Sequence, residues 1–339
     1  MMNSEIKALR EEINKIDVEL IKLLQSRKQI TNSLIQNKIE HHLPVLDEVR
    51  EKEIINNFIE NSNFLNPVFI KKLFNLIFDD SKRQYYKLEQ LNSIEDYLKR
   101  RPIFIAGPCV VESYYQIDKI AAQLTQCGIK FLRGGTFKPR TSPNSFQGLG
   151  DEGVKLLYSA ARKHNMFTVT EVLEVEHLER NYNLIDIVQI GSRSMTSYGL
   201  LKSIGQLTAK TQKVVLLKRG FSATISEFLQ AAEYILQAGN NNIILCLRGI
   251  RTFEQIDSTL RFTPDLASIL ELKEKTKLPV IFDPSHSCGI SDFVVNISNA
   301  ALQLGADGVM VETHYDPKAS KVDAKQAIIP DKVLDILNL

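Results

Sequence analysis

The residues that could do chemistry are, first, a set of cations that recur where apolar, β-branched runs end. Six of them lie at such an end or in the loop that follows it: Arg133, Lys138, Arg140, Arg193, Lys218 and Arg248. One Arg or Lys at such a place is usually a solvated loop charge, but several converging cations would repel one another without an anionic ligand. The chain has no P-loop and no GxGxxG motif before a helix, so a nucleotide is not indicated. Because guanidinium groups suit phosphates and carboxylates, the cations predict small sugar or enol phosphates as substrates.

A second set of residues offers mixed ligands for a metal ion. It consists of Cys109, His286, Glu312 and Asp323. Sulfur, nitrogen and oxygen ligands together suit a borderline divalent ion such as Mn, Fe, Co or Zn, with positions left open for a carbonyl or a water. Taken alone, Cys109 could also be a small buried hydrophobic residue, since free cysteine is often buried and inert. The spacing of the four residues does not by itself prove a metal site.

The elements that must position these residues alternate regularly along the chain. Apolar runs typical of strands begin near Pro102, Phe131, Phe167, Ile187, Val214, Ile243, Val280 and Gly308. Helix-length segments lie between them, for example 115–127, 153–165, 225–238 and 294–304. Eight strands and eight helices in about 240 residues are the size of a (β/α)₈ TIM barrel, whose active site lies at the carboxyl ends of the strands. A doubly wound open sheet is the alternative.

The composition sets limits on partners and location. The 42 basic and 40 acidic residues nearly cancel, so neither nucleic acid nor an anionic membrane is expected as a partner. The four cysteines are far apart and form no CxxC pair, which argues against a disulfide framework and favours a reducing compartment. No stretch approaches the roughly 20 apolar residues of a membrane span. We therefore expect a cytoplasmic protein.

The first 92 residues have a different pattern from the rest. Apolar residues recur at positions 6, 9, 13, 16, 20, 23, 30 and 34, which predicts one long helix with a buried seam. A break at 41–44 precedes a second helix over 47–59 with Asp47 as its N-cap, and Asn66-Pro67 opens a third helix. The polar segment 88–101 then marks a boundary between an all-helical domain, 1–92, and a barrel domain, 93–339.

Three helices, one of them long, make too thin a core for a monomer, so we expect a homodimer or homotetramer. A coiled-coil-like interaction module is the simplest interpretation of this domain. Arg27 lies within its apolar seam and must either form an internal salt bridge or await an anion, because an unpaired buried cation costs several kcal/mol.

Several motifs of the barrel domain resemble one family. They are AGPCVVES at 106–113, RGGTFKPRTSP at 133–143, QIGSRSM at 189–195, LLKRG at 216–220, RGIRTFE at 248–254, DPSH at 283–286 and VETH at 311–314. The chain is similar to the 3-deoxy-D-arabino-heptulosonate 7-phosphate (DAHP) synthases, in the short bacterial form that is fused to an N-terminal chorismate mutase. The resemblance implies condensation of phosphoenolpyruvate with erythrose 4-phosphate, the entry reaction of aromatic biosynthesis.

The resemblance also implies roles for single residues of the barrel. The metal ligands would be Cys109, His286, Glu312 and Asp323, and Lys138 would support the alkoxide that forms. Phosphoenolpyruvate would lie against Arg133, Lys138, Ser192, Arg193, Lys218 and Arg248, and the aldose phosphate against Arg140, Thr141 and Ser285. Leu247 stands where the family commonly has a glutamate, from which we expect an altered affinity for phosphoenolpyruvate.

The N-terminal domain resembles the all-helical chorismate mutases over nearly its whole length. By that resemblance one chain would bind chorismate or prephenate through Arg27, Lys38, Asp47, Arg50, Glu51 and Ser81, while Arg10 would reach over from a partner chain. Arg10 and Arg27 are about 26 Å apart along one helix, too far for one small dicarboxylate to contact both within a chain. Tyr85 stands where the family has a Gln or Glu that contacts the ether oxygen.

Two alternatives remain open. Because of Tyr85, the N-terminal domain could be a non-catalytic sensor of chorismate or prephenate that regulates the barrel. An octulosonate phosphate synthase shares the barrel and phosphoenolpyruvate but takes a five-carbon aldose phosphate. The KPRTS run at 138–142 favours the shorter aldose by family resemblance.

Overall fold

The computed structural model describes residues 2–40, 48–62, 65–88, 94–139, 144, 146–252, 262–320, 322 and 324–337. They belong to two compact units, Met1–Asn92 and Ser93–Leu339. Among the described helices, none combines the length and the apolar character that a membrane span requires.

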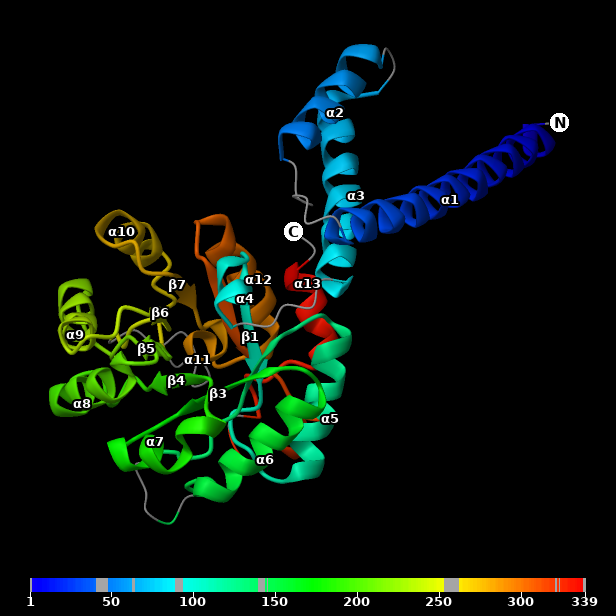
Figure 1. Ribbon diagram of the computed structural model, residues 1–339. Helices are drawn as coiled ribbons and strands as arrows, with labels where there is room; N and C mark the ends of the chain where they lie inside the picture. Colours follow the sequence, from blue (N-terminus) through cyan, green and yellow to red (C-terminus); the bar gives the residue numbers. More distant parts are fainter. Residues whose placement is uncertain are drawn as a thin grey trace. The chain divides into compact units, whose positions relative to one another are not determined.

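The larger unit is a closed barrel of parallel strands that follow one another in sequence order (Figure 1). The strands are β1 (Ile103–Gly107), β2 (Phe131–Arg133), β3 (Phe167–Glu171), β4 (Ile187–Ile190), β5 (Val214–Lys218), β6 (Ile243–Leu247), β7 (Val280–Phe282) and β8 (Gly308–Glu312). The barrel closes where β8 pairs with β1 and Glu312 lies opposite Gly107. The predicted (β/α)₈ barrel is confirmed, and the open sheet is excluded.

Helices surround the strands on the outside (Figure 1). They are α5 (Tyr114–Gln126), α6 (Gly150–Lys163), α7 (Val175–Asn181), α8 (Tyr198–Ala209), α9 (Ile225–Gln237), α10 (Ala267–Lys275), α12 (Ser291–Gln303) and α13 (Leu334–Leu337), with 3₁₀ turns at Tyr182–Leu184, Pro317–Ala319 and Pro330–Val333. The short helix α11 (Pro284–Cys288) differs, because all of its residues are buried and it follows the end of β7. Local sequence explains several starts. The Ser113 hydroxyl accepts the Gln116 N–H at 3.1 Å before α5, and Thr224 and Glu227 form a capping box at α9.

Two apolar layers hold this unit together. The inner layer fills the barrel with alternate strand residues such as Ile105, Leu216 and Met310. The outer layer lies between strands and helices. A short helix before the first strand, α4 (Ile94–Lys99), adds Tyr97 and Leu98 to the inner layer, so it packs against the residues where the strands begin. The opposite ends of the strands are left for polar side chains.

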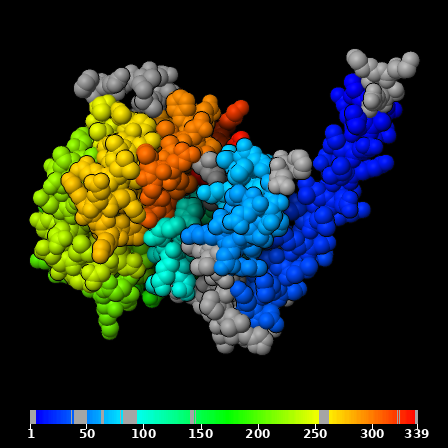
Figure 2. All heavy atoms as spheres, turned by 90° about the horizontal axis from the view of Figure 1, so that it is seen from above, coloured from blue at the N-terminus to red at the C-terminus, as the bar shows by residue number. Residues whose placement is uncertain are grey.

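The smaller unit consists of α1 (Met2–Glu40), α2 (Glu48–Asn61) and α3 (Pro67–Leu88). The third helix begins as predicted, because the Asn66 side chain accepts the Val68 N–H at 2.8 Å. It contacts both other helices, and the N-terminal part of α1 extends beyond them (Figure 1, Figure 2). The predicted apolar seam of α1 is exposed within one chain, with Ile16 65%, Leu23 63% and Ile30 71% exposed.

Candidate active site

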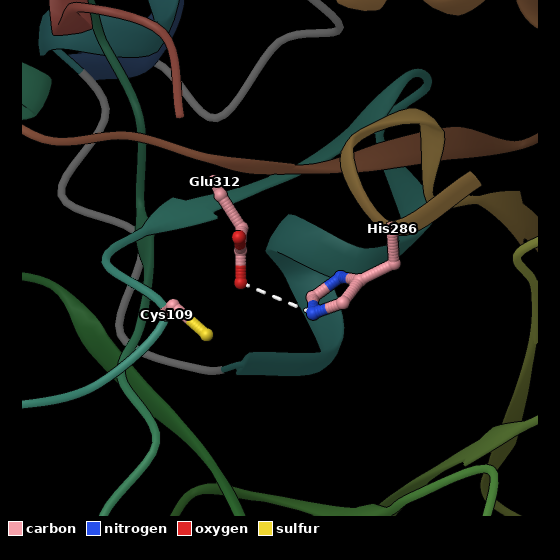
Figure 3. A group of neighbouring side chains, drawn as sticks. All are labelled: Cys109, His286 and Glu312. Carbon is pink, nitrogen blue, oxygen red and sulfur yellow. Dashed lines mark ion pairs between the residues drawn. The ribbon is translucent and has the colours of Figure 1, made fainter. Parts of the chain in front are cut away.

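The carboxyl ends of β1, β7 and β8 bring three predicted metal ligands together (Figure 3). Cys109 lies just after β1, His286 in α11 after β7, and Glu312 is the last residue of β8. One ligand atom from each lies within 4.8 Å of the others, and all three residues are buried. His286 Nε2 is 3.1 Å from Glu312 Oε1. Asp323, the fourth predicted ligand, lies outside the described residues.

The chemistry of this cluster fits a borderline divalent cation. It combines a sulfur, an imidazole nitrogen and a carboxylate oxygen, and the Lys138 ammonium donates to Cys109 Sγ at 3.1 Å. Burial lowers the pKa of Lys138, but Cys109, Glu171 and Glu312 together outweigh this effect, and the pKa is raised. Burial raises the pKa of Cys246 and of Cys288 to about 12, which keeps these two cysteines as thiols.

A buried ion pair joins Arg133 to Glu312, one of the predicted metal ligands. Arg133 Nη1 lies 2.6 Å from Glu312 Oε1, and the two side chains are 3% and 2% exposed. Burial raises the pKa of Glu312, but His286 and Arg133 outweigh it and hold the pKa well below its usual range. Gly107 permits this arrangement, since a Cβ there would lie 1.9 Å from the Arg133 carbonyl oxygen. The strand that carries Arg133 can therefore approach Gly107 closely, and Gly107 also lies opposite Glu312 on β8.

Asp283 is a buried carboxylate that the sequence analysis did not assign. It caps α11 by accepting the His286 N–H at 3.0 Å, and it accepts from His286 Nδ1 at 2.8 Å. Lys218, at the end of β5, donates to the same carboxylate. Burial raises the pKa of Asp283, but His286 and Lys218 lower it well below the ordinary value. The aspartate of the DPSH motif, followed by a proline as at a helix start, was the signal that could have found it.

Two further polar residues hold Glu312 in place. Gln326, almost fully buried, donates to Glu312 Oε2. The Ser285 hydroxyl accepts the Glu312 backbone N–H at 2.9 Å and is fully buried. Ser285 therefore contacts the strand that carries Glu312, and its assignment to an aldose phosphate stays a prediction.

Arginines gather on two aromatic rings at the same end of the barrel. Phe221 and Phe262 stack with centroids 5.2 Å apart. The guanidinium carbons of Arg193, Arg248 and Arg251 lie 5.2, 4.8 and 5.0 Å from the Phe221 centroid. Neither Arg193 nor Arg251 forms an ion pair with a described residue. Their charges are therefore available to an anionic ligand.

The remaining predicted residues of the barrel are Ser192, Arg140, Thr141 and Leu247. Ser192 is half-buried, and its Oγ has no hydrogen-bond partner among the described residues. Arg140 and Thr141 lie outside the described residues. Leu247 is fully buried in the outer apolar layer, so a carboxylate at this position would face that layer. The expected effect of Leu247 on the Arg248 cation has no support in this packing.

The smaller unit brings together two of its predicted residues. Arg27 Nη1 of α1 lies 3.3 Å from the Ser81 hydroxyl of α3, and its guanidinium is 5.8 Å from the Phe78 ring centroid. No described carboxylate pairs with Arg27, so the alternative of an internal salt bridge is wrong within the described part of the chain. Arg10 is exposed on the extending part of α1.

The other predicted residues of this unit lie at the end of α1, in α2 or outside the described residues. Lys38 and Glu51 are half-buried, and Arg50 is exposed and pairs with Glu53 at 3.3 Å. Asp47 and the side chain of Tyr85 lie outside the described residues. Their predicted roles stay predictions.

Fold and site together define a (β/α)₈ barrel protein whose strand ends can hold a divalent metal beside anionic ligands. The chain belongs to the DAHP synthetase I family, which residues 93–338 match. Residues 9–86 match the chorismate mutase type II family.

Individual relatives agree with this assignment. The phospho-2-dehydro-3-deoxyheptonate aldolase of Thermotoga maritima is 46% identical over 224 residues, which are 66% of this chain and 64% of that protein. A 2-dehydro-3-deoxyphosphooctonate aldolase of Francisella tularensis subsp. holarctica is 28% identical over 259 residues, which cover 70% of this chain and 90% of that protein. This chain thus spans about two thirds of the Thermotoga relative.

Solved structures give the same picture. The crystal structure of the Thermotoga maritima DAHP synthase has a TM-score of 0.65 at 44% identity, covering 69% of this chain and 66% of that one. A truncated form of 3-deoxy-D-arabino-heptulosonate 7-phosphate synthase from the same organism has a TM-score of 0.61 at 40% identity, covering 69% and 83%.

Proposed function

We propose that the barrel condenses phosphoenolpyruvate with erythrose 4-phosphate and water to give DAHP and phosphate. The observation that carries the proposal is the cluster of Cys109, His286 and Glu312, buried within 4.8 Å of one another. Two cations contact it, Arg133 at Glu312 and Lys138 at Cys109. Family membership supports the same reaction. An anionic enol phosphate suits this electropositive, largely buried strand end.

The metal would be held by Cys109, His286 and Glu312, with Asp323 as the fourth ligand that the resemblance implies. A divalent ion bound there, of Mn, Fe, Co or Zn, supplies Lewis acidity that polarises the aldehyde carbonyl. Metal analysis of the purified protein would identify which of these ions it binds.

The residues of the chain have separate tasks in this reaction. Arg133, Arg193 and Arg248 would hold the phosphate and carboxylate of phosphoenolpyruvate. C3 of phosphoenolpyruvate bonds to the aldehyde carbon, while the aldehyde oxygen takes a proton from Lys138, whose Nζ lies 3.1 Å from Cys109 Sγ. Water then adds at C2 and returns one proton to the Lys138 amine. The bond from C2 to the bridging oxygen breaks, and phosphate leaves with the proton of the C2 hydroxyl, so that C2 becomes the ketone. The Lys138 ammonium is packed against the metal ligands. The proton donor and the Lewis acid would therefore both act on the aldehyde oxygen.

A comparison of aldose phosphates tests this proposal against the octulosonate alternative. The protein, loaded with Mn²⁺, is given phosphoenolpyruvate and either erythrose 4-phosphate or arabinose 5-phosphate, and phosphate release is followed. The proposal predicts a higher kcat/KM with erythrose 4-phosphate. A preference for arabinose 5-phosphate would assign the barrel to the octulosonate reaction. A relative at 28% identity carries the name of that enzyme, 2-dehydro-3-deoxyphosphooctonate aldolase.

For the smaller unit we propose conversion of chorismate to prephenate at a site shared between two copies of the chain. This reaction needs only a folded conformer of the substrate with cations beside its carboxylates and ether oxygen. Arg27, next to Ser81, supplies one cation. Arg10 lies about 26 Å further along the same helix, so it can complete the site only from a second copy. The exposed apolar seam of α1 gives that copy its binding surface.

The alternative is a sensor without turnover, which the position of Tyr85 favours. In that case chorismate or prephenate would bind and change the rate of the barrel reaction. An assay of the full chain with chorismate separates the two: turnover supports the mutase, whereas binding of prephenate without turnover supports the sensor. Unchanged barrel kinetics at saturating prephenate would remove the regulatory role. A cytoplasmic location fits both, because the four cysteines are unpaired thiols.

A further inference from the structure

A chain of alternating charges crosses the active site. It runs from Lys218 through Asp283, His286 and Glu312 to Arg133. His286 stands at its centre, with Nδ1 2.8 Å from Asp283 and Nε2 3.1 Å from Glu312. Each end is a buried ion pair, one with Lys218 and one with Arg133. The chain thus links two predicted cations of the anion site to two predicted metal ligands.

Asp283 is the member that serves both sides. Its carboxylate is almost fully buried, and among the described residues it forms hydrogen bonds with His286 and Lys218. One oxygen accepts the His286 backbone N–H, which fixes the start of α11. The other accepts from the imidazole Nδ1, which leaves Nε2 turned toward Glu312 and available to a metal. Removal of this carboxylate would therefore free the ring and deprive the lysine of its counter-ion.

We propose that Asp283 is a positioning residue through which the metal site and the anion site are coupled. The proposal rests on the function proposed above. Asp283 holds the His286 tautomer that presents Nε2 to the metal, and Lys218 competes for the same carboxylate. The charge on Lys218 therefore acts on the metal site through Asp283, although the lysine itself binds no metal.

This coupling predicts opposite effects of two substitutions on one affinity. Asp283→Asn removes the negative charge and the acceptor of the Nδ1 hydrogen, so the affinity for Co²⁺ falls 10- to 100-fold, on the order found for partners of ligating histidines. Lys218→Met removes a positive charge near the ion and leaves Asp283 wholly to His286. The affinity for Co²⁺ then rises, by about fivefold or more. If Asp283 and Lys218 had only a structural role, both Asp283→Asn and Lys218→Met would lower the affinity for Co²⁺.

The experiment titrates Co²⁺ into the metal-free full chain and follows the absorption of the cobalt–thiolate bond, without any turnover. Asp265→Asn is the matched control, because Asp265 likewise pairs with a buried cation, Arg219, while its described hydrogen bonds are with Arg219 and Ser268 and not with the cluster. It should leave the Co²⁺ affinity unchanged. Equal affinity in the parent and Asp283→Asn, or weaker binding in Lys218→Met, overturns the coupling while the proposed function stands. A parent that binds no Co²⁺ overturns both.

A second measurement keeps the inference testable if Asp283→Asn does not fold. The unsubstituted protein, labelled with ¹⁵N-histidine and loaded with Zn²⁺, reports the state of each ring nitrogen by NMR. The inference predicts that His286 carries its hydrogen on Nδ1 and binds the metal through Nε2. A hydrogen on Nε2, or metal binding through Nδ1, overturns it.

Discussion

Replacement of Arg133 by methionine should destabilise the metal-free barrel, because it leaves a buried carboxylate without its cation. The pair is 97% or more removed from solvent at both side chains, with Nη1 and Oε1 2.6 Å apart. Breaking such a pair from one side costs about 3–5 kcal/mol. Glu312 keeps its contacts with Gln326 and His286, so we expect the lower end, about 3 kcal/mol.

The assay is urea unfolding in the presence of a chelator, followed by circular dichroism of the barrel transition. With an m-value of about 3 kcal/mol/M, the midpoint should fall by about 1 M. The variant Arg133→Met with Glu312→Gln should regain most of the loss, since a neutral amide needs no cation. A loss under about 1 kcal/mol, or a double variant no more stable than the single one, would refute this reasoning.

Three further predictions concern other parts of the molecule. Phe221→Leu removes the ring that three arginines contact. It should raise the KM for phosphoenolpyruvate about three- to tenfold in steady-state kinetics, with little change in kcat. An unchanged KM would mean that the ring does not position the arginines. Asp307→Asn should cost about 1–3 kcal/mol at pH 7, because Asp307 accepts from Lys273 and from the Val280 N–H. Burial raises the pKa of Asp307, but these donors lower it below 3.8, so the folded state binds fewer protons than the unfolded one. The stabilisation is therefore complete above about pH 4 and is lost as the pH falls through the lower folded value. Urea unfolding at several pH values should show the difference between the variant and the parent shrinking below pH 4, and a constant difference would contradict the assignment. Ile30→Asp, at a side chain 71% exposed within one chain, should shift sedimentation toward monomer; an unchanged mass would show that the α1 seam is not the contact.

The barrel could be predicted closely from the sequence because its strands are buried on both faces. Seven of the eight expected runs begin at the first residue of a strand, and the first strand begins at Ile103, one residue after Pro102. Such strands are continuous runs of branched apolar residues, which stand out against amphipathic helices. Helix starts were less accurate. For example, α6 begins at Gly150 and not at 153, because no side chain caps it.

The residues of the cluster could be predicted from the sequence, but their hydrogen-bond and ion-pair partners could not. Strand ends indicated Cys109, His286 and Glu312, since a barrel brings these ends together. Asp283 and Gln326 act through other side chains, and no spacing in the sequence shows which carboxylate a given lysine or histidine will contact. The expected contact of Lys218 with phosphoenolpyruvate stays a prediction, and its hydrogen bond to Asp283 was not foreseen. Such pairings depend on the register of non-adjacent strands.

The most direct test of the account is metal-dependent phosphate release by the barrel. The metal-free full chain is given phosphoenolpyruvate and erythrose 4-phosphate, with and without Mn²⁺, and the assay is repeated with Cys109→Ala. The account predicts turnover that requires the metal and that Cys109→Ala abolishes, while the far-ultraviolet circular dichroism stays that of the parent. Turnover by Cys109→Ala at the parent rate, or none by the parent with any divalent ion, would contradict it.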